Sequence, residues 1–150
     1  MKDDLTEVLN KVTCCDVLLL GTPIYFSNIT GEMLSFLERL LFSNMTYNTG
    51  TPSTFKGKLS SGVVYTMNVS FDVMKEFGYK VLFNHYKSWL EKLLGDPSEI
   101  LISNDTYQFD DYSKYEANMF DEKWKAHVKA EQFPIDCQKA FEMGVRLTRK

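Results

Sequence analysis

The chain has 150 residues, of which 44% are hydrophobic and 14% aromatic, so it can bury a core and is not a disordered chain. Its formal net charge of −3 gives no electrostatic basis for binding nucleic acid or an anionic membrane surface. The longest apolar run is far shorter than the roughly 20 residues of a membrane-spanning helix, and the first residues lack a signal-peptide core. We therefore expect one cytoplasmic domain over residues 1–150.

The three cysteines have no metal-binding spacing. Cys14 and Cys15 are adjacent, Cys137 is distant, and no histidine lies near them in the sequence. Adjacent cysteines are poorly placed to bind one ion together, so we expect free, partly buried thiols and no metal site.

In chain order, the first expected element is a helix over Asp3–Val12. Val17–Leu20 is a continuous apolar run ended by Gly21, which is typical of a strand buried on both faces of a parallel sheet. A polar and aromatic loop over 22–29 follows. Thr30 then caps a helix that ends near Ser43, with an apolar stripe formed by Met33, Leu34, Leu37, Leu40 and Leu41.

Residues 44–57 contain Gly50 and Pro52 and predict an irregular surface segment. A second strand is expected over Gly62–Met67, with Asn68 following it. The pattern then predicts a long helix over Phe71–Leu94, although Gly78 weakens its middle, and a third strand over Glu99–Ser103.

The last part of the chain is rich in aromatic residues. We expect residues 104–119, which include Tyr107, Phe109 and Tyr112, to fold back on the sheet. A helix is predicted over Asp121–Lys129 and a break over Glu131–Pro134. The final helix is expected to place five side chains against the core: Cys137, Ala140, Phe141, Val145 and Leu147.

Strands that alternate with helices predict an α/β fold with a parallel sheet. Ligands of such folds sit beyond the carboxyl ends of the strands, which makes the loop after Leu20 the first candidate for function. Taken by itself, this loop is more readily interpreted as a plain strand-to-helix connection. We interpret Lys56 and Lys58 as solvated charges rather than phosphate ligands, and Arg39 as one half of a structural ion pair. His85 and His127 are interpreted as surface or packing residues.

The segment Gly21–Phe26, the pair Thr30-Gly31 and the run Phe36–Arg39 resemble the flavodoxin-like NADPH-dependent FMN reductases, a family that includes the iron–sulfur flavoproteins. Glu131–Pro134 and the helix after it agree with the same family. The resemblance implies a three-layer α/β/α fold in which the strands seen here correspond to the third, fourth and fifth of the order 2-1-3-4-5. The family's first strand–helix unit, with its phosphate loop, and its cysteine cluster have no counterpart in these residues, so a truncated fold is expected.

The resemblance also implies an FMN site and NAD(P)H as co-substrate, with hydride passing through flavin N5 and no catalytic side chain required. By resemblance, the cofactor-binding residues are Pro23, Ile24, Tyr25, Phe26, Asn28, Thr30 and Gly31, with Met67 and Asn68 as further candidates. Backbone groups of Pro23–Phe26 would meet the polar edge of the ring, and Tyr25 or Phe26 would pack beside it.

Two other functions stay open at this point. A flavodoxin-like module whose FMN binding is lost or weakened could act as an assembly or regulatory partner. An electron-carrier flavodoxin is disfavoured by the small net charge. In either case Val17–Leu20 would form an open sheet edge, so we expect a homo-oligomer or a partner that covers it, and no nucleic acid or membrane partner.

Overall fold

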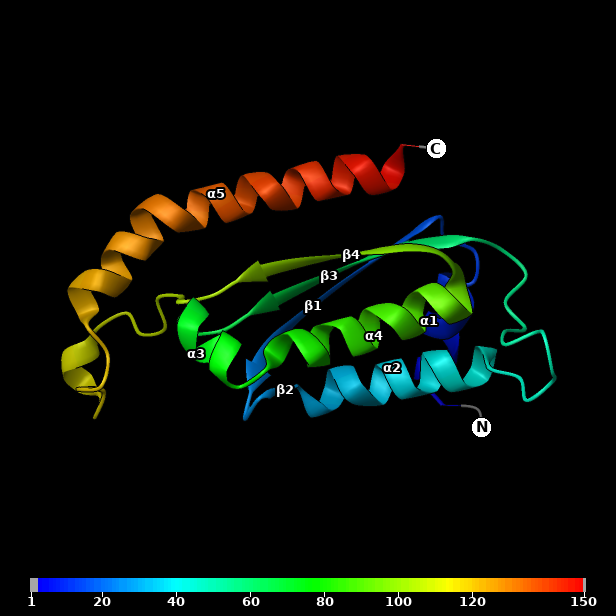
Figure 1. Cartoon of the computed structure of the whole chain (residues 1–150), viewed down its shortest axis with the longest axis horizontal. Helices are drawn as coiled ribbons and strands as arrows, with labels where there is room; N and C mark the ends of the chain where they lie inside the picture. The colour runs from blue at the N-terminus through cyan, green and yellow to red at the C-terminus, as the bar shows by residue number, and fades with distance from the viewer. Residues whose placement is uncertain (1–2, 150) are drawn as a thin grey trace.

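A computed structural model describes residues 3–149. Its sheet has the order β2-β1-β3-β4, in which β1, β3 and β4 are parallel and the short β2 is antiparallel to β1 (Figure 1). The strands are β1 (Val17–Tyr25), β2 (Asn28–Ile29), β3 (Leu59–Thr66) and β4 (Gly95–Ser103). The α-helices are α1 (Leu5–Val12), α2 (Gly31–Asn44), α3 (Phe71–Glu76), α4 (Tyr79–Leu94) and α5 (Glu122–Thr148). This is the flavodoxin-like α/β architecture that the sequence predicts.

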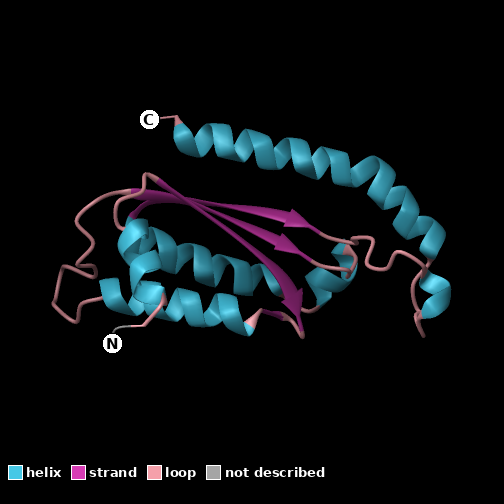
Figure 2. Ribbon diagram, turned by 180° about the vertical axis from the view of Figure 1, so that it is seen from behind, coloured by secondary structure: helices cyan, strands magenta, loops and turns pink. Residues whose placement is uncertain are grey.

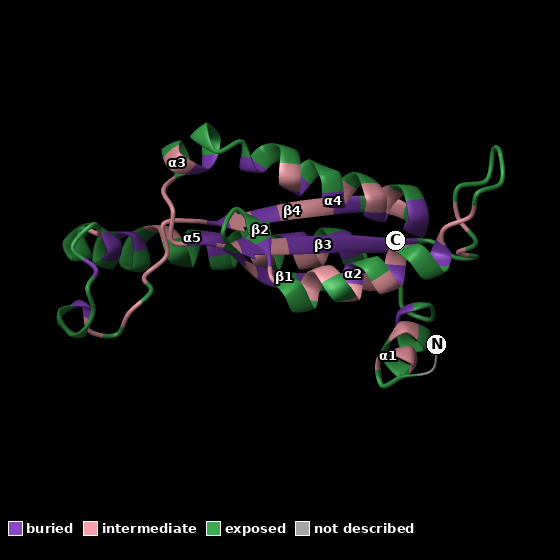
Figure 3. Cartoon of the chain, turned by 90° about the horizontal axis from the view of Figure 1, so that it is seen from below, coloured by how far each residue is buried: buried purple, intermediate pink, exposed green. Residues whose placement is uncertain are grey.

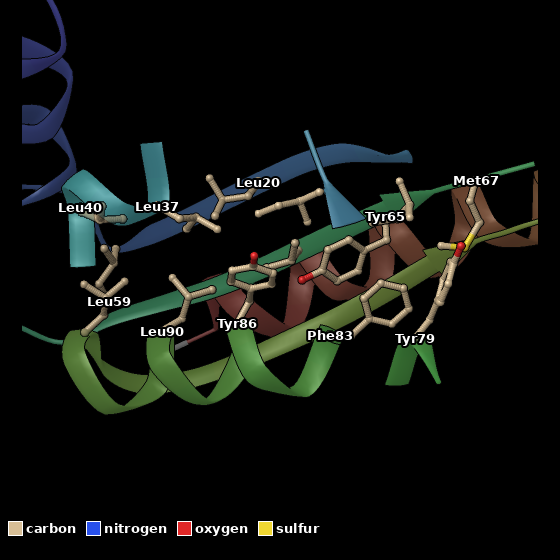
Figure 4. Packing of buried hydrophobic residues seen from close by; sticks show 14 of the residues in the cluster. Leu20, Leu37, Leu40, Leu59, Tyr65, Met67, Tyr79, Phe83, Tyr86 and Leu90 are labelled. Carbon is tan, nitrogen blue, oxygen red and sulfur yellow. The ribbon is translucent and has the colours of Figure 1, made fainter. Parts of the chain in front are cut away.

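The sheet lies between two layers of helices. Helices α2 and α4 cover one face and α5 covers the other, while α1 lies at the amino end of β1 (Figures 1 and 2). The central strand β3 is buried along almost its whole length (Figure 3). The larger core lies under α2 and α4 and joins Leu20 and Val63 of the sheet to Leu37 and Leu90 of these helices (Figure 4).

The smaller core lies under α5, where Leu101 packs with Met143 and Leu147. Gly62 of β3 allows α5 to pack this closely on the sheet. A Cβ atom on Gly62 would lie 2.8 Å from Leu19 Cδ2 and 2.9 Å from Leu147 Cδ1, which is closer than carbon atoms pack. The absence of a side chain at Gly62 therefore sets how closely α5 lies on the sheet.

The long helix predicted over residues 71–94 is two helices. Gly78 has φ +68°, a left-handed conformation that separates α3 from α4. Ser70 caps α3 by accepting from the Val73 N–H at 3.4 Å, and Gly95, with φ +81°, ends α4. Strand β4 starts at this same Gly95, four residues earlier than predicted.

The break predicted at Glu131–Pro134 is wrong, because α5 continues through Pro134 as one helix of 27 residues. Proline removes one backbone donor, but the ring of Pro134 is exposed to solvent, where a small bend is tolerated. Ala140 and Leu147 pack on the sheet as expected, whereas Cys137 and Phe141 are exposed. Cys14 and Cys15 are exposed as well, so the expectation of partly buried thiols is also wrong.

Residues 104–119 only partly cover the sheet. Thr106 bonds the Met67 carbonyl at the end of β3, but the rest extends away from the strands (Figures 1 and 2). There Tyr112 is buried against Tyr107 and Phe109, with ring centroids 5.1 Å apart in both pairs. Between residues 3 and 149, none of the helices has the combination of length and apolar character that crossing a bilayer requires.

Candidate functional site

The loop predicted after Leu20 is a β-hairpin. Strand β1 continues to Tyr25, the chain turns at Phe26 and Ser27, and β2 returns with Tyr25 opposite Asn28 and Ile24 opposite Ile29. A loop over residues 22–29 was expected, and the paired strands correct that expectation. The hairpin stands at the carboxyl end of β1, the edge of the sheet at which open α/β folds bind ligands.

The turn of this hairpin is strained. Phe26 has φ +49° and Ser27 has φ +61°, and neither residue is glycine. Two-residue hairpins of type I′ need positive φ at both central positions, which costs roughly 1–2 kcal/mol at each residue that carries a Cβ. Residues held in such conformations occur preferentially at functional sites.

The side chains of the hairpin divide into two sets. Ile24 and Ile29 are buried at 8% and 5% exposure and fix the base of the hairpin in the core. Tyr25 and Phe26 point into solvent, at 61% and 105% exposure. The hairpin therefore presents two aromatic side chains on a rigid base, whereas the side chain of Ile24 is not available to a ligand.

The other residues of this segment lead into α2. Pro23 is the last residue of β1 to pair with β3, opposite Thr66. Thr30 caps α2 by accepting from the Met33 N–H at 3.2 Å, and Gly31 is the exposed first residue of the helix. The backbone N–H of Thr30 is itself held by Thr22 Oγ1 at 3.3 Å. The hairpin and the amino end of α2 are thus one connected structure.

Met67 and Asn68 follow the neighbouring strand, β3, and so lie at the same edge of the sheet. Met67 is buried in the core at 4% exposure, so its side chain is not presented to a ligand. Asn68 donates from Nδ2 to Gln108 Oε1 at 2.5 Å, and its Oδ1 atom is buried without a hydrogen-bond partner. An unpaired buried acceptor is costly, and this oxygen is enclosed rather than exposed at the end of the strand.

A buried ion pair lies behind Asn68. Lys125 of α5 is paired with Asp105, and their side chains are 5% and 14% exposed. Lys125 Nζ also donates to the Asn68 carbonyl at 2.6 Å, and Trp124 Nε1 donates to Asp105 Oδ2 at 2.6 Å. The sequence did not indicate this cluster, because the residues that bond to one another lie 19 to 57 positions apart in the chain.

Neither of the basic residues considered for phosphate binding is near this edge. Lys56 and Lys58 are exposed and immediately precede β3, at the amino end of the sheet. In the part of the chain that the structure describes, no cluster of three or more His, Cys, Asp or Glu side chains is placed to hold a metal ion. The exposed side chains of the hairpin at this end of the sheet are Tyr25, Phe26, Ser27 and Asn28.

Comparison with known proteins gives a family match over the first half of the chain. The model of the NADPH-dependent FMN reductase family matches residues 1–75, half of the 150 residues. The matched part runs from α1 through the hairpin, α2 and β3 into α3.

Two iron–sulfur flavoproteins of Archaeoglobus fulgidus are similar in sequence. One is 39% identical over 44 residues, which cover 29% of this chain and 22% of the relative. The other is 32% identical over 63 residues, which cover 42% of this chain and 26% of the relative. The aligned part is therefore about a quarter of the length of these relatives.

Among solved structures, an NADPH-quinone reductase from P. pentosaceus has a similar fold. The two superpose with a TM-score of 0.53 at 9% sequence identity, over 83% of this chain and 70% of the other. The likeness supports the flavodoxin-like assignment of the fold.

Proposed function

Because the chain belongs to the NADPH-dependent FMN reductase family, we propose that it forms the domain of an NAD(P)H-dependent flavin oxidoreductase, with residues 1–150 as one unit. The observation that carries this proposal is the strained hairpin with Tyr25 and Phe26 exposed at the carboxyl edge of the sheet. Two solvent-exposed rings beside backbone and amide groups suit a flat heteroaromatic ligand with one polar edge.

In this proposal the chain binds and orients the ring of FMN. Backbone groups of Pro23–Phe26 face its polar edge, Tyr25 or Phe26 packs beside it, and Asn28, Thr30 and Gly31 close the site at the start of α2. Asn68 adds an amide from the end of β3, while Ile24 and Met67 support the site from the core. When bound, FMN supplies hydride chemistry at its N5 atom, with NAD(P)H as co-substrate, so no catalytic side chain is needed.

Direct titration tests the proposal. Purified protein is titrated into FMN, and quenching of the flavin fluorescence gives the dissociation constant. Oxidation of NADPH or NADH with FMN present is then followed by the loss of absorbance of the reduced nicotinamide. Saturable binding with flavin-dependent oxidation supports the proposal, and a folded protein that does not bind FMN contradicts it.

A second candidate is a flavodoxin-like module with weakened FMN binding that serves as an assembly or regulatory partner. The position of Lys56 and Lys58, at the opposite edge of the sheet, favours this candidate, because neither lysine reaches a phosphate near the hairpin. Riboflavin, which lacks the phosphate, separates the two functions. Equal affinities for riboflavin and FMN indicate a site for the ring alone, whereas a reductase that anchors the phosphate binds FMN at least tenfold more tightly, since charge-assisted hydrogen bonds contribute about 1.5–3 kcal/mol each.

The outer edge of β1 is relevant to the oligomeric state of the chain. Within residues 3–149, this edge pairs only at Ile24 and Tyr25, with β2, and Leu19 beside it is 57% exposed. Unpaired strand edges associate readily with other strands. We expect a second copy of the chain to cover this edge, and light scattering coupled to size-exclusion chromatography that finds a stable monomer would contradict this.

A further inference from the structure

Two buried tyrosines of α4 reach the hairpin with their hydroxyl groups. The Ser27 hydroxyl donates to the Tyr79 oxygen at 3.1 Å. The Tyr86 hydroxyl donates to Asn28 Oδ1 at 3.4 Å. Tyr79 and Tyr86 are seven residues apart, two helical turns, so both side chains leave α4 on the face that packs against the sheet (Figure 4).

The tip of the hairpin is also held by the pairing of Tyr25 with Asn28 and by the Ile29 N–H, which donates to Asn28 Oδ1 at 2.9 Å. Phe26 is fully exposed and contributes no packing, while the buried residues Ile24 and Ile29 hold only the base. Since Phe26 and Ser27 are both in the left-handed region, the turn persists only where surrounding groups hold it. Ser27 and Asn28, the residues that close the turn, are the ones that bond the two tyrosines.

The tyrosines are themselves firmly placed. Tyr79 is 7% and Tyr86 is 9% exposed. Tyr79 meets the edge of Phe83 at 6.1 Å, and Phe83 stacks on Tyr65 of β3 at 4.2 Å. Burial, together with the nearby charge of Glu38, raises the pKa of Tyr86, so its hydroxyl is a donor at neutral pH and stays one under more alkaline conditions than an ordinary tyrosine.

From this geometry we infer that Tyr79 and Tyr86 are positioning residues, which hold Ser27 and Asn28 and thereby keep the hairpin in the conformation that binds the flavin ring. The inference rests on the proposed function. It assigns a role to two residues of α4 that lie outside the part of the chain matched by the family. Each acts through the hairpin and does not itself touch the ligand.

The substitutions Tyr79→Phe and Tyr86→Phe, singly and together, test the inference because each removes one hydroxyl and keeps the buried ring. Tyr65→Phe is the matched control. Tyr65 lies in the same core at 1% exposure, and its hydroxyl makes no hydrogen bond to the hairpin in the described chain. We measure hydrogen–deuterium exchange of the backbone amides of residues 25–30 without ligand, the FMN dissociation constant and the thermal midpoint.

Each tyrosine substitution is expected to raise the exchange rate of residues 25–30 and to weaken FMN binding about two- to tenfold, the range for loss of one hydrogen bond. The double variant should show the larger effect. Exchange in β4 should stay close to that of the unmodified protein, and the thermal midpoint of each single variant should fall by about 1–6 °C, as expected for the loss of one hydrogen bond. Tyr65→Phe should change neither exchange nor binding.

The outcomes separate this inference from the proposed function. If the unmodified protein does not bind FMN, the proposed function is wrong, and the exchange of residues 25–30 alone decides whether the tyrosines hold the hairpin. Unchanged exchange and unchanged FMN affinity in the double variant would overturn the inference. A rise in exchange across the whole sheet would also overturn it, because that result indicates a general structural role.

Discussion

Lys125 of α5 forms an ion pair with Asp105, the second residue after β4, in a setting where both side chains are almost fully buried. Asp105 has φ +58°, and its backbone N–H donates to the Val69 carbonyl at 2.9 Å. Lys125 also bonds the Asn68 carbonyl at 2.6 Å. One cation therefore joins the first part of α5 to the segments that follow β3 and β4.

Replacing Lys125 with methionine should destabilise the protein strongly. The substitution leaves Asp105 buried without its cation and the Asn68 carbonyl without its donor, and the loss of one partner from a buried pair costs about 3–5 kcal/mol. Urea unfolding of Lys125→Met measures the change, with Lys123→Met, exposed on the same helix, as the control. The double variant Lys125→Met/Asp105→Asn should regain part of the loss, and a single variant as stable as the control would refute this account.

The contact between Arg39 of α2 and Asp3, which precedes α1, should make stability depend on pH at the acid end. Arg39 Nη1 lies 2.5 Å from Asp3 Oδ2, and this hydrogen bond holds the pKa of Asp3 below its ordinary value. A carboxyl with a lowered folded-state pKa stabilises the fold above its unfolded pKa and loses that contribution as the pH falls through the folded value.

We therefore expect Arg39→Gln to lower the free energy of unfolding at pH 7 and to have no effect once Asp3 is protonated in both proteins. NMR titration of the Asp3 carboxyl checks the cause, since its midpoint should rise toward the ordinary value in Arg39→Gln. An unchanged midpoint would show that Arg39 does not set the pKa of Asp3.

Gly62 gives a test of how α5 packs. A valine there would overlap with Leu19, Met143 and Leu147, and excess volume in a packed core costs about 1–3 kcal/mol. Gly21→Val is the matched control, because a Cβ on this glycine of β1 meets no atom within 4 Å. Chemical unfolding should show a loss for Gly62→Val alone. Equal stabilities would mean that α5 shifts away from the sheet at little cost.

Periodicity predicted the elements that depend on local pattern. The strand before Gly21, the cap at Thr30 and the stripe of α2 each follow from residues close in sequence, and all three are present. The strand is not buried on both faces as predicted, because Leu19 is 57% exposed. Arg39 forms the structural ion pair expected of it. The parallel order of β1, β3 and β4 also follows, because strands joined through helices pair in parallel.

The errors arise where tertiary contacts outweigh local preference. Pro134 does not end α5, since the helix is held on both sides of it by Lys125 and by the Arg146–Glu99 pair at 2.7 Å. The turn at Phe26 and Ser27 carries no glycine or asparagine, so the usual signal of a two-residue hairpin is missing. The hydroxyls of Tyr79 and Tyr86 bond Ser27 and Asn28, which precede them by 52 and 58 positions in the chain. Contacts over such sequence distances cannot be predicted from periodicity.

Relieving the strain at Phe26 should make the protein more stable and, at the same time, weaken FMN binding. Asparagine tolerates positive φ far better than phenylalanine, so Phe26→Asn should relieve the turn and raise the free energy of unfolding by about 1 kcal/mol. For a chain of this size that corresponds to a thermal midpoint higher by about 2–4 °C. The exposed side chain of Phe26 makes no packing contribution that the substitution would remove.

The same substitution should weaken FMN binding, because it removes one of the two exposed rings of the hairpin, Tyr25 and Phe26, of which one is proposed to pack beside the flavin. Tyr25→Asn is the control: Tyr25 is also exposed but lies in strand β1, so this variant should weaken binding without any gain in stability. Calorimetric melting and FMN titration of both variants separate the two effects. If Phe26→Asn is more stable and binds FMN as tightly as the unmodified protein, the ring of Phe26 does not contact the cofactor, and the strain at the hairpin needs another explanation.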